Sequence, residues 1–366
     1  MSAGLYVHVP FCVTRCGYCD FNAYEGLGHL RSGYVAALVR EAELAAPDWS
    51  GEMFASVFLG GGTPTTLDVE DLQALLSRLR STVAVASDAE VTIEANPDTV
   101  DRAKLSGLLD AGYTRLSMGA QSFDRRVLAS LERLHDPDSV TRAMHAVRAV
   151  GYANVNLDLI YGANGETLES WERTLRATVD LQPEHISAYA LTIEPSTPLG
   201  RKVQRGVAQA PDADLQADMF ELACEVLGEA GFHHYEVSNW TKPGFECRHN
   251  LGYWERRPYF GLGAGAHSYR DDHRWWNVRP PEEYLSLVES RRLPIGGDER
   301  LQPNDAHLEE VFLRLRILEG VPSSWVEEER SAPFVASGLL VENDGALVPT
   351  ERGMLVLNEL VLALAG

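Results

Sequence analysis

Six short runs rich in β-branched and apolar residues alternate with helical patterns over the first 200 residues, and this alternation constrains the fold more than any other feature. The runs span residues 5–9, 55–59, 90–95, 115–120, 154–161 and 185–191. Between them lie amphipathic patterns, such as residues 69–83 and 138–150, in which apolar residues recur at intervals of three and four. Strands that alternate with helices pair in parallel, so the pattern predicts an α/β fold built as a wound barrel or an open sheet. In such folds the reactive residues gather at the C-terminal ends of the strands.

The pattern changes after about residue 200. A helical stretch at 214–231 precedes a segment rich in Trp, Tyr, His, Gly and Pro, which predicts an irregular lobe that covers the barrel. After about residue 300, a helical stretch at 307–321 is followed by two β-like runs separated by Asn343-Asp344-Gly345, which indicates a hairpin turn. We therefore expect a barrel at 1–200, a covering lobe at 201–300 and a small α+β domain, winged-helix-like, at 301–366.

The charge and the two ends of the chain exclude several classes of protein. The chain has 366 residues, 45% of them hydrophobic, and a net charge of −21. So acidic a surface repels phosphate backbones, which argues against a nucleic-acid partner and against an RNA-modifying enzyme. The first residues lack a secretory pattern, and the apolar tail is interrupted by Asn358 and Glu359, so no transmembrane segment is expected. A cytoplasmic protein is predicted.

Three of the five cysteines, Cys12, Cys16 and Cys19, lie directly after the first predicted strand; the others are Cys224 and Cys247. Thiolates are soft ligands that select iron–sulfur clusters, zinc or cuprous copper. A structural zinc ion needs four ligands, and with no second cysteine pair it would require a distant histidine or Cys247. A [4Fe-4S] cluster normally has four cysteine ligands, so three would leave one iron open. The spacing favours an open-site cluster over zinc.

The arrangement Cys12-x3-Cys16-x2-Cys19, with Tyr18 before the last cysteine, resembles the signature of the radical S-adenosylmethionine (SAM) superfamily. The resemblance implies that the open iron of a [4Fe-4S] cluster chelates the amino and carboxylate groups of SAM. It also implies that Tyr18 lies near the adenine and that the fold is a partial (β/α)6 TIM-like barrel.

The glycine-rich sequence LGGGTPTTL, residues 59–67, directly follows the second predicted strand. A glycine run by itself fits a tight strand–helix turn as well as a binding loop. The resemblance implies that Gly61, Gly62 and Thr63 contact the SAM amino group through their backbone.

Polar residues interrupt three of the apolar strand patterns near their ends: Glu94, Gln121 and Asp158. A buried carboxylate is costly unless it is paired or hydrogen-bonded, so each position is either a structural hydrogen bond, a solvent-exposed strand end or part of a site. Three such positions in one barrel favour a site. Arg133 is a candidate partner for a carboxylate group.

The sequences YVHVPFC and GGGTPT narrow the resemblance to the oxygen-independent coproporphyrinogen III dehydrogenases and the related HemW-type haem chaperones. By the same match, Tyr6 and Thr192 join the residues expected to contact SAM. The dehydrogenases carry a fourth cysteine where this chain has Phe21, and a longer N-terminal extension than the 11 residues that precede Cys12. In both features this chain resembles the chaperones.

A second discriminator is the hexapeptide HNLGYW, which begins at His249 and matches the HNxxYW motif of the chaperone group. Imidazole ligates haem iron, and aromatic rings pack on a porphyrin face. An isolated histidine among aromatic residues is more often structural, but the whole motif implies that His249 is an axial haem ligand. Cys247 is a less favoured ligand. We expect His233, His234 and His267 to be structural, although His267 lies in a glycine-rich loop that could line a pocket.

The resemblance therefore implies a haem-binding chaperone that carries a SAM-bound [4Fe-4S] cluster and delivers haem to apo-haemoproteins such as respiratory cytochromes, with a cluster-dependent homodimer also suggested. The alternative is an oxygen-independent coproporphyrinogen III dehydrogenase, which decarboxylates propionates with a 5′-deoxyadenosyl radical. The same cluster ligands serve both functions, so residues 1–200 do not separate them.

Overall fold

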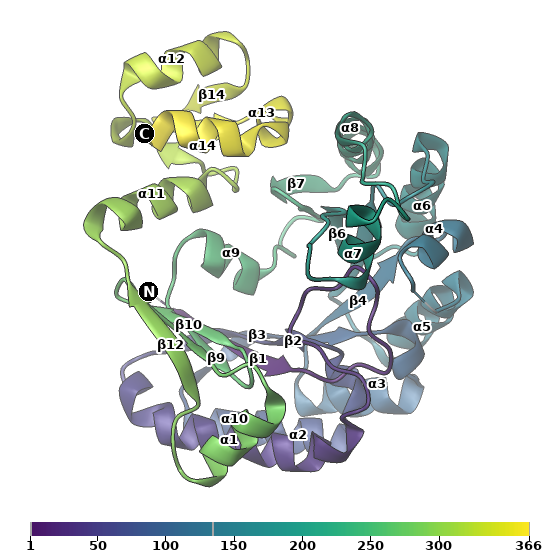
Figure 1. Ribbon diagram of the computed structural model, residues 1–366, viewed down its shortest axis with the longest axis vertical. Coiled ribbons are helices and arrows are strands. Elements are labelled where there is room, and N and C mark those ends of the chain that lie inside the picture. The colour runs from purple at the N-terminus through teal and green to yellow at the C-terminus, as the bar shows by residue number, and fades with distance from the viewer. Residues whose placement is uncertain (1, 134, 366) are drawn as a thin grey trace.

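Six parallel strands form the centre of the computed structural model, which describes residues 2–133 and 135–365 (Figure 1). They are β1 Ala3–Val9, β2 Phe54–Gly61, β3 Val85–Ala95, β4 Arg115–Gln121, β5 Val155–Tyr161 and β6 His185–Ala190. Each strand pairs in parallel with the next, so all six predicted strands are confirmed. Within the described residues β1 and β6 do not pair with each other, and the barrel is therefore open, as a partial (β/α)6 barrel requires.

Helices connect the parallel strands and cover the outer face of the barrel (Figure 1). They are α1 Arg31–Ala45, α2 Val69–Thr82, α3 Arg102–Ala111, α4 Arg125–Ser130, α5 Pro137–Val150 and α6 Leu168–Asp180, with short 3-10 turns η1 Gly28–Leu30, η2 Ala46–Trp49, η3 Pro64–Thr66 and η4 Pro97–Thr99. Helix α5 illustrates how the sequence sets such an element. The Asp136 side chain caps its N-terminus, and Gly151 ends it with a φ of 96°. Between these ends Val140, Met144 and Val147 recur at three and four and are buried against the sheet.

Residues 198–300 extend the sheet on both of its edges. The elements are α7 Pro198–Gln204, α8 Ala213–Glu229, β7 His233–Glu236, β8 Asn239–Thr241, α9 Arg248–Trp254, β9 Tyr259–Leu262, β10 His267–Arg270, β11 His273–Asn277, α10 Pro281–Glu289 and β12 Ile295–Arg300. Strand β8 pairs antiparallel with β6, whereas β9 pairs in parallel with β1 and leads into the antiparallel strands β10, β11 and β12. The segment expected to be irregular thus contributes six short strands to one continuous sheet. The domain boundaries at 200 and 300 stay predictions.

The C-terminal residues form a small three-stranded antiparallel sheet with helices around it, at the top of Figure 1. The elements are α11 Pro303–Arg314, β13 Val321–Pro322, η5 Ser323–Trp325, α12 Glu328–Ala336, β14 Leu340–Asn343, β15 Ala346–Pro349, α13 Glu351–Leu355 and α14 Leu357–Ala365. Asp344 and Gly345 join β14 to β15 with φ angles of 48° and 79°, as a two-residue type I′ turn requires, so the predicted hairpin is confirmed. Among the described residues, no helix is long and apolar enough to cross a membrane.

Candidate functional site

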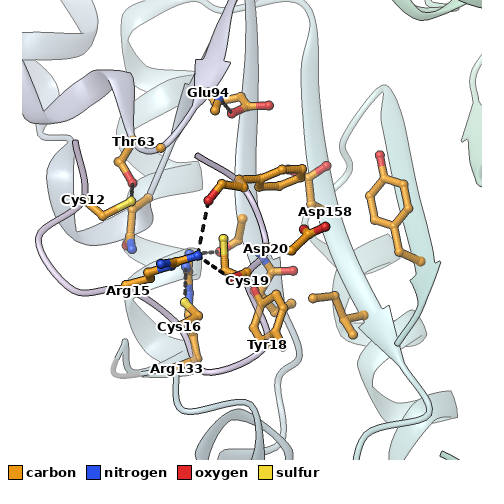
Figure 2. Close-up of a pocket in the computed structure, with 18 of the residues that line it drawn as sticks. Cys12, Arg15, Cys16, Tyr18, Cys19, Asp20, Thr63, Glu94, Arg133 and Asp158 are labelled. Carbon is orange, nitrogen blue, oxygen red and sulfur yellow. Dashed lines mark hydrogen bonds between the residues drawn. The ribbon is translucent and has the colours of Figure 1, made fainter. Parts of the chain in front are cut away.

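A pocket of about 440 Å³ opens at the C-terminal ends of the barrel strands, where the sequence predicted a site. The cysteine-bearing loop after β1 forms one side, and the ends of β2 to β6 form the others (Figure 2). Most of the predicted site residues line it: Cys12, Cys16, Tyr18, Cys19, Gly61, Gly62, Thr63, Glu94, Gln121, Arg133, Asp158 and Thr192. The structure therefore brings together residues that lie up to 180 positions apart in the sequence.

The cysteine loop is closed at its base by backbone hydrogen bonds. The Cys12 N–H donates to the Tyr24 carbonyl at 2.9 Å, and the Tyr24 N–H donates to the Pro10 carbonyl at 2.7 Å. The loop thereby leaves β1 and returns beside it, which directs the cysteines toward the pocket rather than along the sheet. All three are free thiols of intermediate exposure.

The thiols are suited to a soft metal centre. Burial raises the pKa of Cys12, and it raises the pKa of Cys19 to about 11, so both thiols are neutral at pH 7 in the absence of a metal. Binding of an iron–sulfur cluster would release these protons. Among the described residues, no three His, Cys, Asp or Glu side chains are grouped closely enough to hold a single metal ion. The three thiols lie instead around one pocket, and their number and softness fit a cluster with three cysteine ligands.

Arg133 makes contacts that the sequence did not reveal. Its Nη1 donates to the Cys16 sulfur at 3.4 Å, its Nη2 donates to the Gly119 carbonyl at 3.1 Å, and its Nε donates to His135 Nδ1 at 3.0 Å. A Cβ on Gly119 would lie 3.0 Å from Arg133 Nη2 and 2.7 Å from Gln121 Nε2. Gly119 and His135 therefore position Arg133. This arrangement is visible in the structure but not in the sequence.

The glycine-rich loop is tightly packed against β1. Gly61 has a φ of 102°, and a Cβ there would lie 2.2 Å from the His8 ring. The N–H groups of Gly61, Gly62 and Thr63 donate to Glu94 Oε2, to the Val9 carbonyl and to the Phe11 carbonyl. Because these donors are occupied, a contact with an amino group would come from a carbonyl or hydroxyl oxygen of the loop.

Two half-buried carboxyl groups face the pocket, Glu94 from β3 and Asp158 from β5. Burial raises the pKa of Glu94 to about 8, and the nearby Asp158 adds to this shift. Burial also raises the pKa of Asp158, opposed by hydrogen bonds from Ser117 Oγ at 3.0 Å and Asn156 Nδ2 at 2.8 Å. Part of the role of Asp158 is therefore structural. Two carboxyl groups in one buried pocket favour a ligand with a positive charge.

Tyr6 lies outside the cysteine pocket. It is half-buried inside the barrel, and its hydroxyl lies 3.0 Å from His8 Nδ1. It lines a second cavity of about 190 Å³, which shares Glu94, Asp158 and Tyr189 with the cysteine pocket. A direct contact of Tyr6 with a ligand in the cysteine pocket stays a prediction.

The HNLGYW hexapeptide lies on helix α9, and its histidine is also inside the barrel. His249 is 3% exposed, its Nδ1 lies 2.9 Å from Ser56 Oγ, and its Nε2 lies 3.0 Å from the Tyr253 hydroxyl. Its ring stacks on Phe58 at 5.1 Å between centroids, and burial lowers its pKa to about 3. Because both ring nitrogens are hydrogen-bonded, neither is open to a haem iron in this arrangement. Ligation of haem by His249 stays a prediction that would require helix α9 to rearrange.

The remaining candidates of this region differ in their surroundings. Cys247 is buried 3.5 Å from Glu90 Oε1, and burial raises its pKa to about 12. His233 lies 3.0 Å from Glu246, and His234 stacks on Trp240 at 4.4 Å between centroids, which agrees with the structural roles expected for them. His267, by contrast, is exposed and lines a pocket.

Comparison with known proteins defines the class. The model of the radical SAM superfamily matches residues 6–178. The structure resembles coproporphyrinogen III oxidase (HemN) from Escherichia coli, a radical SAM enzyme, with a TM-score of 0.86 and 24% identity over 99% of this chain and 89% of that chain. The open barrel thus has the radical SAM fold, and it carries three cysteines on the loop after its first strand.

The curated relatives narrow the class to one family. The chain is 44% identical to Heme chaperone HemW of Mycobacterium tuberculosis over 99% of this chain and 95% of the relative. It is 34% identical to Heme chaperone HemW of Bacillus subtilis and 35% identical to that of Escherichia coli, again over at least 96% of each chain. The chain belongs to the HemW family of the radical SAM superfamily.

Proposed function

We propose that this protein is a haem-binding chaperone that carries a SAM-liganded [4Fe-4S] cluster and delivers haem to apo-haemoproteins, including respiratory cytochromes. The observation that carries the proposal is the 44% identity to a relative named Heme chaperone HemW, which extends over 99% of this chain. The cysteine pocket, which is lined by all three cysteines of the predicted cluster site, supports the proposal.

Cys12, Cys16 and Cys19 would hold the cluster. When bound, a cluster with three cysteine ligands supplies one open iron that chelates the amino and carboxylate groups of SAM. The loop Gly61–Thr63 and the carboxyl groups of Glu94 and Asp158 surround the rest of the pocket, where they favour the positively charged groups of SAM. Tyr18 lines the same pocket and offers an aromatic face for the adenine.

The alternative function is the oxygen-independent dehydrogenation of coproporphyrinogen III. The cysteine pocket by itself would serve that chemistry equally, because reductive cleavage of SAM uses the same ligands. Phe21 argues for the chaperone: it is 63% exposed at the rim of the pocket, where the dehydrogenases carry a fourth cysteine. Anaerobic incubation of the reconstituted, reduced protein with coproporphyrinogen III and SAM is expected to give no protoporphyrinogen IX. Formation of protoporphyrinogen IX would favour the dehydrogenase over the chaperone.

Haem titration of the anaerobically reconstituted protein tests the chaperone directly. We expect a Soret absorption band that saturates at one haem per chain, and a shift of that band when an apo-cytochrome is added and takes up the haem. A protein that gives no saturable band, or that retains its haem beside an apo-cytochrome, would contradict the proposal. Size-exclusion chromatography with and without the cluster tests the proposed homodimer, and fractionation of cells tests the proposed cytoplasmic location.

A further inference from the structure

A pocket of about 810 Å³, larger than the cysteine pocket, lies between the edge of the sheet and the C-terminal helices, away from the cysteines. We call it the aromatic slot. One wall consists of Tyr259, His267 and Trp276 from β9, β10 and β11, and a second wall contains Leu308 of α11 and Leu362 of α14. In Figure 1 these helices lie above the strands β9–β12. A volume of this size is in the range of small-molecule sites, roughly 300–1,000 Å³.

The strand period explains why one side of the slot is aromatic. Side chains alternate between the two faces of a strand, so residues i and i+2 share a face. Tyr269 accordingly faces the slot with His267, whereas the intervening Ser268 is buried on the other side. On β11 Trp276 faces the slot, while Trp275 packs on Trp49 at 6.1 Å between centroids.

His267 is available inside this slot. It is exposed, its ring stacks beside Trp276 at 5.6 Å between centroids and 28° between planes, and within the described part of the chain its nitrogens have no hydrogen-bond partner. Partial desolvation of the ring and the nearby charges of Arg274 and Arg279 lower the pKa of His267, which keeps the imidazole neutral at pH 7. A neutral imidazole with a free nitrogen is the form that ligates iron. His249, with both nitrogens hydrogen-bonded, lacks this property.

The second wall leaves apolar surface uncovered. Leu362 is 74% exposed and Leu308 is 41% exposed, although both line the slot. Exposed apolar surface in a hollow marks a binding site more often than a solvated surface. An occupant with a flat apolar body would cover both leucines.

The charges at the slot place the polar end of such an occupant. Glu309 is neutralised by Arg256 at 3.3 Å and by Arg274 at 2.5 Å, and Arg274 also pairs with Glu299 at 2.8 Å. Because both arginines that line the slot are already paired with carboxylates, carboxylate groups of an occupant would lie toward the solvent.

We propose that the aromatic slot binds the haem, with His267 as the iron ligand, Leu308 and Leu362 against the porphyrin and the propionates toward the solvent. This inference rests on the proposed function, since it names where the haem of the chaperone binds. It also gives the HNLGYW helix a role: Tyr253 lines the inner end of the slot while its hydroxyl holds His249. Replacement of His249 would then weaken haem binding because it disturbs Tyr253 in the wall of the slot. The iron ligand His267 would remain.

Titration with two compounds separates iron ligation by His267 from binding of the porphyrin by the rest of the slot. Ferric haem is followed by its Soret band, and metal-free protoporphyrin IX is followed by its fluorescence. We expect His267→Ala to weaken haem binding at least tenfold and to shift the Soret band, and added imidazole to restore the wild-type position of the band. Protoporphyrin binding is expected to be unchanged in His267→Ala, because it involves no iron. His273→Ala, on the neighbouring strand and outside the slot, is the matched control.

A second variant tests the slot itself. Leu362→Glu is expected to weaken haem and protoporphyrin alike, whereas Val207→Glu, at a residue with the same 74% exposure elsewhere, leaves both unchanged. This inference would be overturned if His267→Ala bound haem with the affinity and spectrum of the wild type, or if Leu362→Glu bound haem as tightly as the wild type. The proposed chaperone function would not be contradicted by either result. A wild-type protein that binds no haem would overturn both.

Discussion

The guanidinium of Arg133 donates a hydrogen bond to the sulfur of Cys16 at 3.4 Å, while Gly119 and His135 fix it from the other side. Hydrogen bonds to the cysteine sulfurs are among the factors that set the reduction potential of an iron–sulfur cluster. Because such a bond stabilises the more negative, reduced state, Arg133 has an effect on the cluster that is separate from any contact with SAM.

Arg133→Met is therefore expected to make the midpoint potential of the SAM-free cluster more negative. A hydrogen bond to a charged group contributes about 1.5 kcal/mol, which corresponds to roughly 60 mV for one electron. A redox titration followed by electron paramagnetic resonance measures the shift. Arg126→Met, an exposed arginine of helix α4, is the control. Equal potentials in the wild type and Arg133→Met would contradict the prediction.

Gly119→Ala is expected to displace Arg133 and Gln121 without unfolding the barrel, since the added methyl group would meet the ends of these two side chains. We expect at least a tenfold loss of SAM affinity in the cluster-loaded protein, measured by equilibrium dialysis. Gly228→Ala in helix α8 has open space around its Cβ and is expected to leave SAM binding unchanged. Wild-type affinity in Gly119→Ala would show that Arg133 and Gln121 do not hold SAM.

Replacement of any one of Cys12, Cys16 and Cys19 by alanine is expected to remove most of the iron. Reconstituted wild-type protein should hold about four irons and four sulfides per chain, as the cluster type requires. Iron and sulfide analysis measures this content. Cys224→Ala, outside the cysteine pocket, should retain the wild-type values. One zinc ion per chain and no sulfide in the wild type would refute the cluster.

Glu41 gives the fold a pH dependence. This buried carboxyl group accepts hydrogen bonds from the Gly263 N–H at 2.8 Å, from Asn277 Nδ2 at 2.5 Å and from the Tyr284 hydroxyl at 2.7 Å, yet burial raises its pKa to about 7. Between about pH 4.5 and 7 the folded protein keeps a proton that the unfolded chain has released, so stability falls as the pH rises through this range. The change is at most about 3 kcal/mol.

Urea unfolding of the cluster-free protein at several pH values tests this. Glu41→Gln carries no titrating group, so its stability is expected to fall less than that of the wild type from pH 5 to 7. Glu43→Gln, an exposed position on the same helix, should follow the wild type. Parallel curves for the wild type and Glu41→Gln would disprove the assignment.

Tyr253→Phe is expected to destabilise the protein by about 1–3 kcal/mol, because it leaves the buried His249 Nε2 without its partner. Thermal unfolding of the cluster-free protein measures the change. Tyr269→Phe loses only a hydrogen bond to the exposed Asp272, so its effect should stay below about 1 kcal/mol. A Tyr253→Phe variant as stable as the wild type would indicate that another group or water satisfies the histidine.

The barrel was predictable because its strands are buried on both faces and read as near-continuous apolar runs. All seven residues of β4, for example, are buried. Strands β7–β12 gave no such signal. β12, with the sequence IGGDER, is exposed along most of its length, and its pairing with β11 depends on the neighbouring strand rather than on local propensity.

The candidate site likewise has features that were predictable from the sequence and others that were not. The cysteine loop was predictable because its ligands are spaced within eight residues, and Glu94 was predictable as a polar residue in an apolar strand. The positions of Gly119 and His135 beside Arg133 depend on a bulge at the end of β4, where Gln121 has a φ of 62°. The burial of His249 depends on Ser56, 193 residues earlier in the chain. No local pattern reports contacts of that kind.

The parallel pairing of β1 with β9 also sets the order in which the protein can be completed during synthesis. β1 leaves the ribosome before the other described strands, but residues 259–262 must follow before its second edge is covered. At about 5–20 residues per second, that edge stays open for roughly 10–50 s in each nascent chain. An open strand edge of this kind can pair with another chain until β9 covers it.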